Sequence, residues 1–532
     1  METRWTAPAL GAATALAFLA LTTPRLGAQG LYADEVHQVD AAFFWTGKHP
    51  ALAVSLKLGQ MPVLNMPYSG ALKSTVYGLW MRVAHASFSV ISWRLLGLAF
   101  AAAGAGWLVA AAARCWSAWA ALLLASLLLT DPGLLVMSRH DWGPVALSFL
   151  FRAIFIAAWL RAETCEEPRS WQTFWMGLSL QLAVFEKLSA IVLVAPLALA
   201  LATSARLRKR SLVLGLVRGL LAGAVPLAVV NIASLIDSGR LISLAAAESI
   251  PLTLTSARAL LIAYVSQAAG DGPLSFVLGI APSARMRAVS TLGVCISMGA
   301  LMFAGAWSGR RLARLAAVLA LSWLAIGIGL CLLPKATWVH HWVIGTPFQY
   351  VAMAAGAVAW LTPLEPAAKR AERVLALGVR FALGAGAALV LAAGVSTTIK
   401  VEQAFAEGRS AERFSPELSA AAEAAAAEGP ETIFVAANWG IALQIDSFAN
   451  GRDNFVYERT WTDGGVAKLE KLLRAGVRRL YIVARVPEAG ALAPEEARLF
   501  DDAAALPGWK EKPLPERFAG LRRVKLAMYE RL

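Results

Sequence analysis

Long apolar runs separated by short polar connections dominate the first 396 residues of the chain. A helix needs about 20 mostly apolar residues to cross a bilayer. The runs that approach this length are residues 5–23, 92–113, 116–130, 143–161, 172–184, 188–204, 212–236, 288–307, 315–333, 342–361 and 374–396. The fifth and sixth runs are short and close together, so a single bent helix is an alternative there. The pattern predicts a polytopic α-helical membrane protein with about eleven spans.

The pattern changes after residue 396, where polar and apolar positions mix over shorter distances. An Ala/Glu-rich stretch at 415–428 predicts a helix. Further predicted elements are strands at Thr432–Ala437, Leu480–Ala484 and near Val524–Tyr529, and helices at 464–475 and 494–506. Strands that alternate with helices indicate a small α/β domain. We therefore expect a membrane module at residues 1–396 and a soluble domain at residues 397–532.

Composition agrees with the membrane assignment. Of the 532 residues, 58% are hydrophobic and only 16% are charged, which excludes a typical soluble enzyme and a disordered chain. The net charge of +14 could suggest nucleic-acid binding, but residues 397–532 hold 19 basic and 20 acidic residues. The first 396 residues hold 30 basic and 15 acidic residues, scattered between apolar runs. This is the bias typical of cytoplasmic loops, and no nucleic-acid partner is expected.

The basic residues also predict an orientation. If the N-terminus is cytoplasmic, the inner connections hold fourteen Lys and Arg residues, and the short and medium outer connections, without the long first loop at 24–91, hold seven. The outer segments are then residues 24–91, with an amphipathic helix around Ala71–Val90 at the interface, residues 237–287, and the C-terminal domain. An alternative is that residues 1–28 are a cleaved signal peptide, which would leave every later loop on the same side.

The first group of candidate residues follows the first span, in the run Tyr32-Ala33-Asp34-Glu35-Val36-His37. Asp34 could be a general base at the membrane surface, or it could simply cap a helix. His37 lies three residues later and would share its helix face, so a divalent metal is possible there. The four cysteines show no spacing typical of a zinc site or a disulfide framework.

The second group lies between the third and fourth spans, in Ser138-Arg139-His140-Asp141-Trp142-Gly143-Pro144. Pro144 with Asp141 before it indicates a helix start. Arg139 could bind a phosphate while Asp141 orients a hydroxyl, or the two could form an ion pair.

Cations at outer span ends form the third group, and snorkelling to lipid headgroups could explain any one of them. They are Lys73, Arg94, Arg139, Lys187 and Lys335. Arg152 lies within a span, where it either serves a functional site or pairs with a buried polar group. His340 and His341 end another outer connection and are further site candidates.

The order of these elements resembles the GT-C membrane glycosyltransferases, especially protein O-mannosyltransferases and lipid A aminoarabinose transferases. The resemblance lies in the acidic pair after span one, the segment Pro67–Lys73, the Trp93-Arg94-Leu95 start of span two, Asp141 after span three, Gly177-Leu178 leading to Lys187, and the segment Lys335–Pro347. It covers roughly residues 5–400. One departure is Leu72-Lys73-Ser74-Thr75, where the aminoarabinose transferases have Glu-Lys-Pro-Pro.

The resemblance implies an inner-membrane glycosyltransferase of bacteria that moves a sugar from a polyprenyl-phosphate donor to an acceptor hydroxyl on a lipid, glycan or protein. An inverting single displacement needs one base, for which Asp34 is the candidate, with Glu35 and Asp141 positioning the acceptor. Lys73, Arg139 and Lys187 would stabilise the leaving phosphate. The main alternative is a transporter or flippase of lipid-linked saccharides, but the chain shows no internal repeat. A non-catalytic membrane scaffold that displays the C-terminal domain is a third possibility.

Overall fold

The computed structural model describes residues 6–48, 55–142, 145–242, 254–333, 339–361, 370–438, 440–452, 456–458, 464–473, 476–487 and 490–532. The chain divides into two compact units that are each discontinuous in sequence. The helical unit contains the residues up to Pro24, Leu95–Phe276 and Ile280–Ala406, and the mixed unit contains Arg25–Arg94, Val277–Gly279 and Glu407–Leu532. The expected boundary at residue 396 falls inside a helix, α18, that continues to Ala406.

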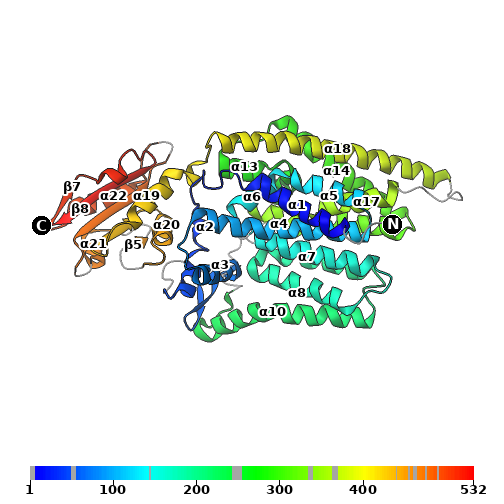
Figure 1. Cartoon of the computed structure of the whole chain (residues 1–532), viewed down its shortest axis with the longest axis horizontal. Helices are drawn as coiled ribbons and strands as arrows, with labels where there is room; N and C mark the ends of the chain where they lie inside the picture. Colours follow the sequence, from blue (N-terminus) through cyan, green and yellow to red (C-terminus); the bar gives the residue numbers. More distant parts are fainter. Residues whose placement is uncertain are drawn as a thin grey trace. The chain divides into compact units, whose positions relative to one another are not determined.

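Helices form nearly all of the helical unit (Figure 1). Their bounds are α1 Thr6–Thr22, α4 Val90–Cys115, α5 Ala118–Leu129, α6 Pro132–His140, α7 Val145–Thr164, α8 Ser170–Glu186, α9 Val194–Thr203, α10 Arg210–Ser238, α12 Leu254–Val265, α13 Asp271–Leu278, α14 Ala284–Trp307, α15 Arg311–Leu332, α16 Val339–Trp342, α17 Phe348–Leu361 and α18 Arg370–Ala406. Short 3₁₀ turns at Leu188–Leu193, Ser266–Ala269 and Val343–Gly345 connect some of them.

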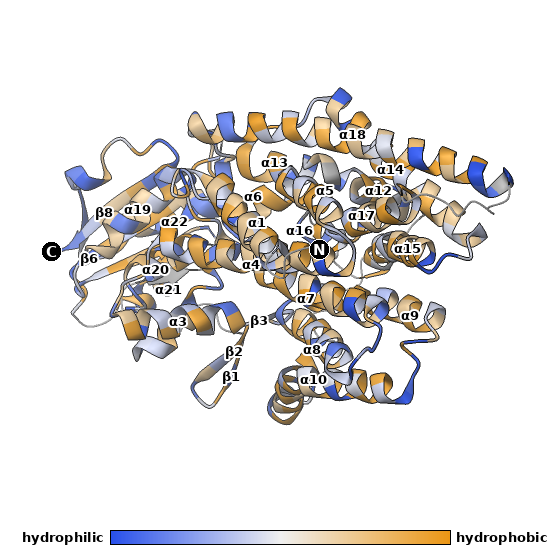
Figure 2. Ribbon diagram, turned by 45° about the vertical axis from the view of Figure 1, so that its right-hand side comes forward, coloured by the Kyte–Doolittle hydropathy of each residue, from blue (hydrophilic) through white to orange (hydrophobic). Residues whose placement is uncertain are grey.

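Seven helices in the described part of the chain are long and apolar enough to cross a membrane, and α5 with α6 adds an eighth if this pair, bent by 62°, counts as one span. The seven are α4, α7, α10, α14, α15, α16–α17 from His340, and α18. Figure 2 shows hydrophobic residues along these helices and hydrophilic residues toward several of their ends. The chain is therefore a multi-pass membrane protein.

The expected count of eleven spans is not confirmed. The runs 5–23 and 172–184 correspond to α1 and α8, each of 17 residues, and the run 188–204 corresponds to a 3₁₀ turn followed by α9. The alternative of one bent helix across 172–204 is wrong, because α8 ends at Glu186 and Lys187 has an extended backbone.

The helices of the helical unit differ in how much of their surface is buried. The apolar window of the span His340–Leu361, which contains α17, is 89% buried, whereas those of α10 and α18 are 28% buried. A helix that packs on all sides needs apolar residues all round, so α17 lies at the centre of the helical unit and α10 and α18 at its periphery.

The N-terminal part of the mixed unit, Arg25–Arg94, follows α1 in the sequence. It contains α2 Ala33–Val36, a 3₁₀ helix at Asp40–Thr46, the antiparallel strands β1 Leu56–Leu58, β2 Met61–Met66 and β3 Ser69–Gly70, and α3 Leu72–Ala84. The sequence pattern did not predict these strands. The predicted amphipathic helix is confirmed as α3, with Val76, Leu79, Trp80 and Val83 exposed; its place at a membrane interface stays a prediction.

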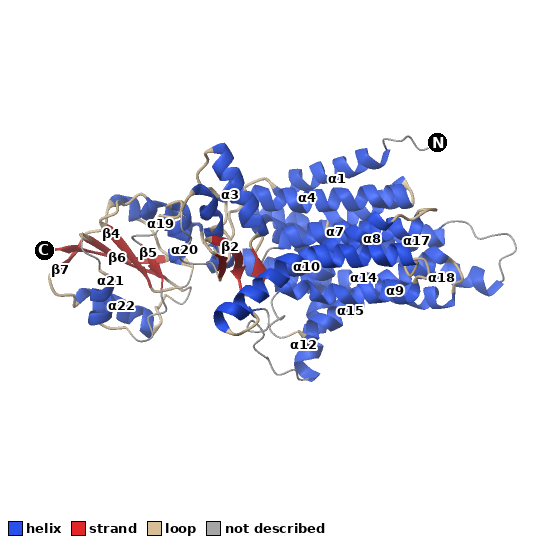
Figure 3. Ribbon diagram, turned by 90° about the horizontal axis from the view of Figure 1, so that it is seen from below, coloured by secondary structure: helices blue, strands red, loops and turns tan. Residues whose placement is uncertain are grey.

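The C-terminal part of the mixed unit is a five-stranded sheet with the order β5-β4-β6-β8-β7 (Figure 3). Its strands are β4 Thr432–Ala436, β5 Val456–Glu458, β6 Arg479–Arg485, β7 Trp509–Lys512 and β8 Val524–Arg531, and its helices are α19 Pro416–Ala426, α20 Ile441–Phe448, α21 Val466–Leu472 and α22 Pro494–Ala504. β4 pairs in parallel with β5 and β6, whereas β8 is antiparallel to β6 and β7.

Each face of this sheet has its own core, because side chains alternate between the faces of a strand. Phe434 and Tyr481 pack with residues of α19 and α20, and Val435 and Ile482 pack with residues of α21 and α22. The three predicted strands and the three predicted helices are confirmed here. Sequence reasoning missed α20, β5 and β7.

Candidate active site

Asp34 lies in the first turn of the short helix α2 in the mixed unit. It is half-buried, and the residue at the helix cap is Tyr32, whose side chain makes no capping bond. The alternative that Asp34 caps a helix is therefore wrong. An acidic side chain in the first turn of a helix interacts favourably with the helix dipole.

Two phenols lie within the field of the Asp34 carboxylate. Burial, and then the charge of Asp34, raise the pKa values of Tyr32 and Tyr68 to about 12. Both hydroxyls therefore stay protonated at neutral pH and can act as hydrogen-bond donors. Sequence reasoning quoted both tyrosines only as neighbours in a motif, and their closeness to Asp34 was not predicted.

Glu35, the neighbour of Asp34, is fully buried and bound to Arg94. The guanidinium donates to both carboxylate oxygens, at 2.7 and 2.9 Å, and also to the carbonyl oxygens of Leu26, Gln29 and Gly30 at 2.7 to 2.9 Å. Both residues are 0% exposed. Such a bidentate pair fixes geometry, so Glu35 and Arg94 hold the segment that carries Asp34.

His37 is a candidate ligand of the possible metal site. Burial lowers the pKa of His37 to about 4, so the imidazole is neutral at physiological pH. Among the described residues, no group of three or more His, Cys, Asp or Glu side chains is arranged to hold a metal ion. The metal suggested by the spacing of Asp34 and His37 gains no third ligand from the described part of the fold.

Lys73 lies in the first turn of α3 and is also buried. Its ammonium lies 3.7 Å from the centre of the Trp93 ring, in a cation–π contact. The next residue, Ser74, donates to the carbonyl of Gln38 at 2.5 Å and accepts from Asn65 at 3.0 Å. These bonds tie the start of α3 to the segment that follows α2.

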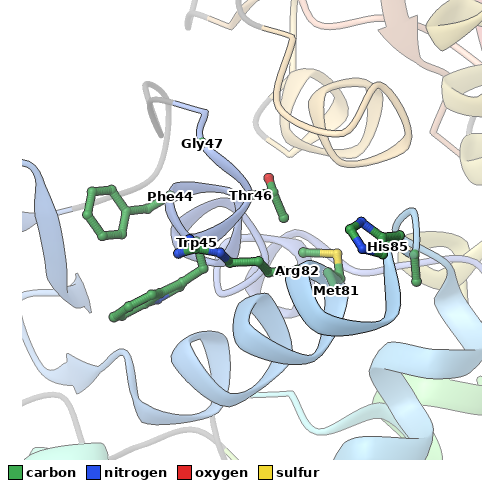
Figure 4. A pocket seen from close by; sticks show the side chains of 8 residues that line it. Phe44, Trp45, Thr46, Gly47, Met81, Arg82 and His85 are labelled. Carbon is green, nitrogen blue, oxygen red and sulfur yellow. The ribbon is translucent and has the colours of Figure 1, made fainter.

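A cavity of about 480 Å³ in the mixed unit lies beside α3. Figure 4 shows its lining, with Arg82 extending from α3 toward Trp45 and His85 at the end of the helix. Its lining residues are Phe44, Trp45, Thr46, Gly47, Met81, Arg82, His85 and Ala86. None of the residues selected from the sequence is among them.

In the helical unit, Arg139 and Asp141 end α6. Arg139 is 1% exposed; it donates to the Pro24 carbonyl at 2.5 Å, lies 3.5 Å from a carboxylate oxygen of Glu402, and stacks on Phe405 at 3.6 Å. Asp141 is buried, has a left-handed backbone and accepts from the backbone N–H of Ala146 at 2.8 Å. Asp141 thus marks the start of α7, as expected, although Gly143 and Pro144 lie outside the described residues.

The structure brings Lys187 and the histidine pair together. The buried ammonium of Lys187 lies 3.1 Å from Nε2 of His340, and the rings of His340 and His341 are 4.1 Å apart. An ammonium only donates, so Nε2 of His340 accepts and the imidazole is neutral. Trp142 joins this group, with its ring 4.9 Å from that of His340 and stacked on Phe276 at 3.7 Å. Lys335 lies outside the described residues.

Arg152 supports this group from within the bundle. Its guanidinium donates to Ser148 at 2.9 Å and to the carbonyl oxygens of Thr346 and Val343 at 3.1 and 3.3 Å. Of the two alternatives for this intramembrane arginine, the structure supports pairing with buried polar groups. Arg152 holds the turn that directly follows His340 and His341.

No family model and no curated protein matches the chain. Among solved structures it is similar to ArnT from Cupriavidus metallidurans bound to undecaprenyl phosphate, at 14% identity and a TM-score of 0.59, over 99% of this chain and 98% of that one. The apo state of the same protein gives 12% identity and a TM-score of 0.58, over 96% of each chain. An oligosaccharyltransferase of Archaeoglobus fulgidus is matched at 12% identity and a TM-score of 0.48, over 91% of this chain and 69% of that one. The chain therefore has the fold of ArnT, a lipid A aminoarabinose transferase, and the GT-C fold that the sequence resemblance implied is confirmed.

Proposed function

We propose that the chain is a membrane glycosyltransferase that transfers a sugar from a polyprenyl-phosphate donor to an acceptor hydroxyl. The observation that carries this proposal is the fold similarity over almost the whole of both chains to ArnT in complex with undecaprenyl phosphate. A shared fold does not by itself fix a function. The burial and the contacts of the candidate residues within each unit supply the remaining support.

Asp34 is the proposed base. As the acceptor oxygen forms its bond to the anomeric carbon, Asp34 takes the hydroxyl proton, and the bond from that carbon to the phosphate oxygen breaks. One displacement inverts the anomeric configuration. The half-buried carboxylate of Asp34 and the protonated phenols of Tyr32 and Tyr68 suit this role. Glu35 acts only as a positioning residue in this scheme, because Arg94 binds both of its oxygens.

Cations are the proposed stabilisers of the leaving lipid phosphate. Lys73, Arg139 and Lys187 are each at most 5% exposed, and a buried cation stabilises developing negative charge more strongly than a solvated one. The neutral ring of His340, 3.1 Å from the ammonium of Lys187, adds no charge beside it. Asp141 remains the candidate for orienting the acceptor.

The proposed location is a bacterial inner membrane, with the N-terminus in the cytoplasm and the C-terminal domain outside. Three connections assigned to the cytoplasm from their Arg content line a single cavity of the helical unit, through Glu166, Arg206 and Arg311. Connections on the same side of the membrane lie at the same end of the helices. The shared cavity therefore supports the assignment of these three connections to one side.

The experiment that tests the function uses the purified full-length chain in lipid vesicles with polyprenyl-phosphate donors whose sugar is radiolabelled. Cell-envelope lipid and protein fractions serve as acceptors. We expect the label to leave the prenyl phosphate and to appear in an acceptor. Movement of intact donor across the vesicle membrane, without loss of sugar, would instead identify a flippase.

A further inference from the structure

A cavity of the helical unit has a volume of about 1010 Å³, and none of the candidate active-site residues lines it. It is formed by the end of α7, the connection from α9 to α10, and the facing parts of α14 and α15. Pockets that hold small molecules are typically about 300–1,000 Å³, so this one could hold a headgroup with part of an acyl chain.

One side of the cavity is cationic. Four basic residues line it, namely Arg206, Lys209, Arg311 and Arg314, against the two carboxylates of Glu163 and Glu166. Glu163 is 7% exposed and pairs with Arg311 at 3.1 Å, so its charge is neutralised within the wall. Glu166 is exposed, where solvent screens it.

The four cations differ in their freedom to bind a ligand. Arg206 donates to the backbone carbonyls of Glu163, at 3.0 Å, and Glu166, which holds the α9–α10 connection against the end of α7. Lys209 and Arg314 are exposed and approach the cavity from different elements. They are suitably placed to bind a phosphate.

The other side of the cavity is apolar. Trp159 of α7, Met302 of α14, and Leu315, Val318 and Leu321 of α15 line it. Leu321 is 39% exposed, so the apolar wall continues onto the lipid-facing surface of α15. A ligand for this cavity needs an anionic head and a hydrocarbon tail.

We propose that the cavity binds an anionic phospholipid, with the headgroup phosphate on Lys209 and Arg314 and an acyl chain along Val318 and Leu321. Basic pockets between transmembrane helices on the cytoplasmic side are typical sites for such headgroups. Arginine can hold two phosphate oxygens at once and lysine supplies a point charge. The site is separate from sugar transfer and does not depend on it.

The test is lipid binding to the full-length protein in detergent, measured by native mass spectrometry. Phosphatidylglycerol is compared with zwitterionic phosphatidylcholine, with a polyprenyl phosphate and with soluble glycerol phosphate. We expect phosphatidylglycerol to bind more tightly than phosphatidylcholine and glycerol phosphate, whereas the polyprenyl phosphate binds at the proposed donor site. The double variant Lys209→Ala/Arg314→Ala should weaken its binding about 10–100-fold, the loss expected for charge-assisted bonds. The matched control is Arg210→Ala/Arg370→Ala, two exposed arginines that do not line the cavity and should leave binding unchanged.

A second variant tests the apolar wall. Leu321→Trp places a large side chain where the acyl chain would lie and should also reduce binding, whereas Leu292→Trp, at an exposed position of α14 outside the cavity, should not. Thermal unfolding confirms that each variant is folded. Equal affinity for phosphatidylglycerol and phosphatidylcholine, full competition by glycerol phosphate, or unchanged binding of phosphatidylglycerol in Lys209→Ala/Arg314→Ala would each overturn the proposal. So would an equal loss of polyprenyl-phosphate binding in that double variant, because the cavity would then hold the prenyl lipid.

Discussion

Asp34 and Glu35 are adjacent carboxylates with different environments. Glu35 is enclosed and bound by Arg94 through both oxygens, whereas Asp34 is half-buried and acts electrostatically on two phenols. Removing one partner of a buried ion pair leaves an uncompensated charge, which is strongly destabilising. A loss of activity in a Glu35 variant would therefore report on folding, and only Asp34 offers a test of chemistry.

Arg139 tests the phosphate role at the scale of one residue. We expect Arg139→Ala to lower kcat/KM for the donor about 10-fold or more, and Arg139→Lys to restore only part, because lysine cannot hold two phosphate oxygens. The measurement is the donor dependence of transfer at saturating acceptor, with Arg218→Ala, an exposed arginine of α10, as the control. If Arg139 serves only Glu402, Phe405 and Pro24, unfolding temperatures will fall while donor dependence stays unchanged.

His37 makes stability depend on pH. Its pKa is about 4 in the folded chain and about 6.5 when unfolded. The unfolded state thus binds more protons in this interval, and the folded state loses stability as pH falls from about 6.5 towards 4, by about 1.4 kcal/mol per unit.

His37→Asn removes this titration. Its unfolding temperature should fall less than that of the wild type between about pH 7 and about pH 4.5. His85→Asn is the control, since His85 is exposed and Asn tolerates its left-handed backbone. An identical pH dependence in wild type and His37→Asn would show that His37 is not the responsible group.

At the scale of elements, three glycines spaced by four residues on α10 allow it to approach α8 closely. A Cβ atom on Gly219 would lie 2.0 Å from the carbonyl oxygen of Phe174, and one on Gly215 would lie 2.2 Å from that of Ser170. Small residues at such spacing are the usual means of packing helices in membranes.

Gly219→Leu should therefore separate α8 from α10 and destabilise the protein by about 1–3 kcal/mol or more. Gly299→Leu is the matched control, because a Cβ atom at Gly299 of α14 would meet nothing within 4 Å. Thermal unfolding in detergent measures both. Equal unfolding temperatures for the two variants would contradict the close packing of α8 on α10.

Periodicity and length predicted most of the elements, but not their partners. The long apolar runs became helices because a span must satisfy its backbone internally, and the strongest strands, β4, β6 and β8, were also predicted. The short strands β5 and β7 and helix α20 have too few residues to produce a clear pattern. Ion pairs between residues far apart in the sequence, such as Glu35 with Arg94 or Arg139 with Glu402, leave no trace in the local sequence. The candidate residues could therefore be selected from the sequence, but their structural roles could not be predicted from it.

At the scale of the whole molecule, the prediction concerns the membrane topology. We expect residues 397–532 to lie outside the cytoplasmic membrane, because the Lys and Arg clusters fall on the opposite set of connections. Protease added to intact spheroplasts should remove an epitope placed at Leu532. A cytoplasmic marker protein serves as the control for lysis. Protection of the epitope until lysis would reverse the orientation and place the proposed catalytic residues on the cytoplasmic side.

The most direct test of the account is the rate at which Asp34→Asn consumes a labelled polyprenyl-phosphate sugar, beside wild type and the exposed-surface control Asp501→Asn. Asparagine keeps the shape of aspartate and removes the charge that a base requires. We predict a rate about 10²–10⁴-fold below wild type, the usual loss for a general base, with an unchanged unfolding temperature. Wild-type consumption by Asp34→Asn would contradict the assignment of Asp34 as the base.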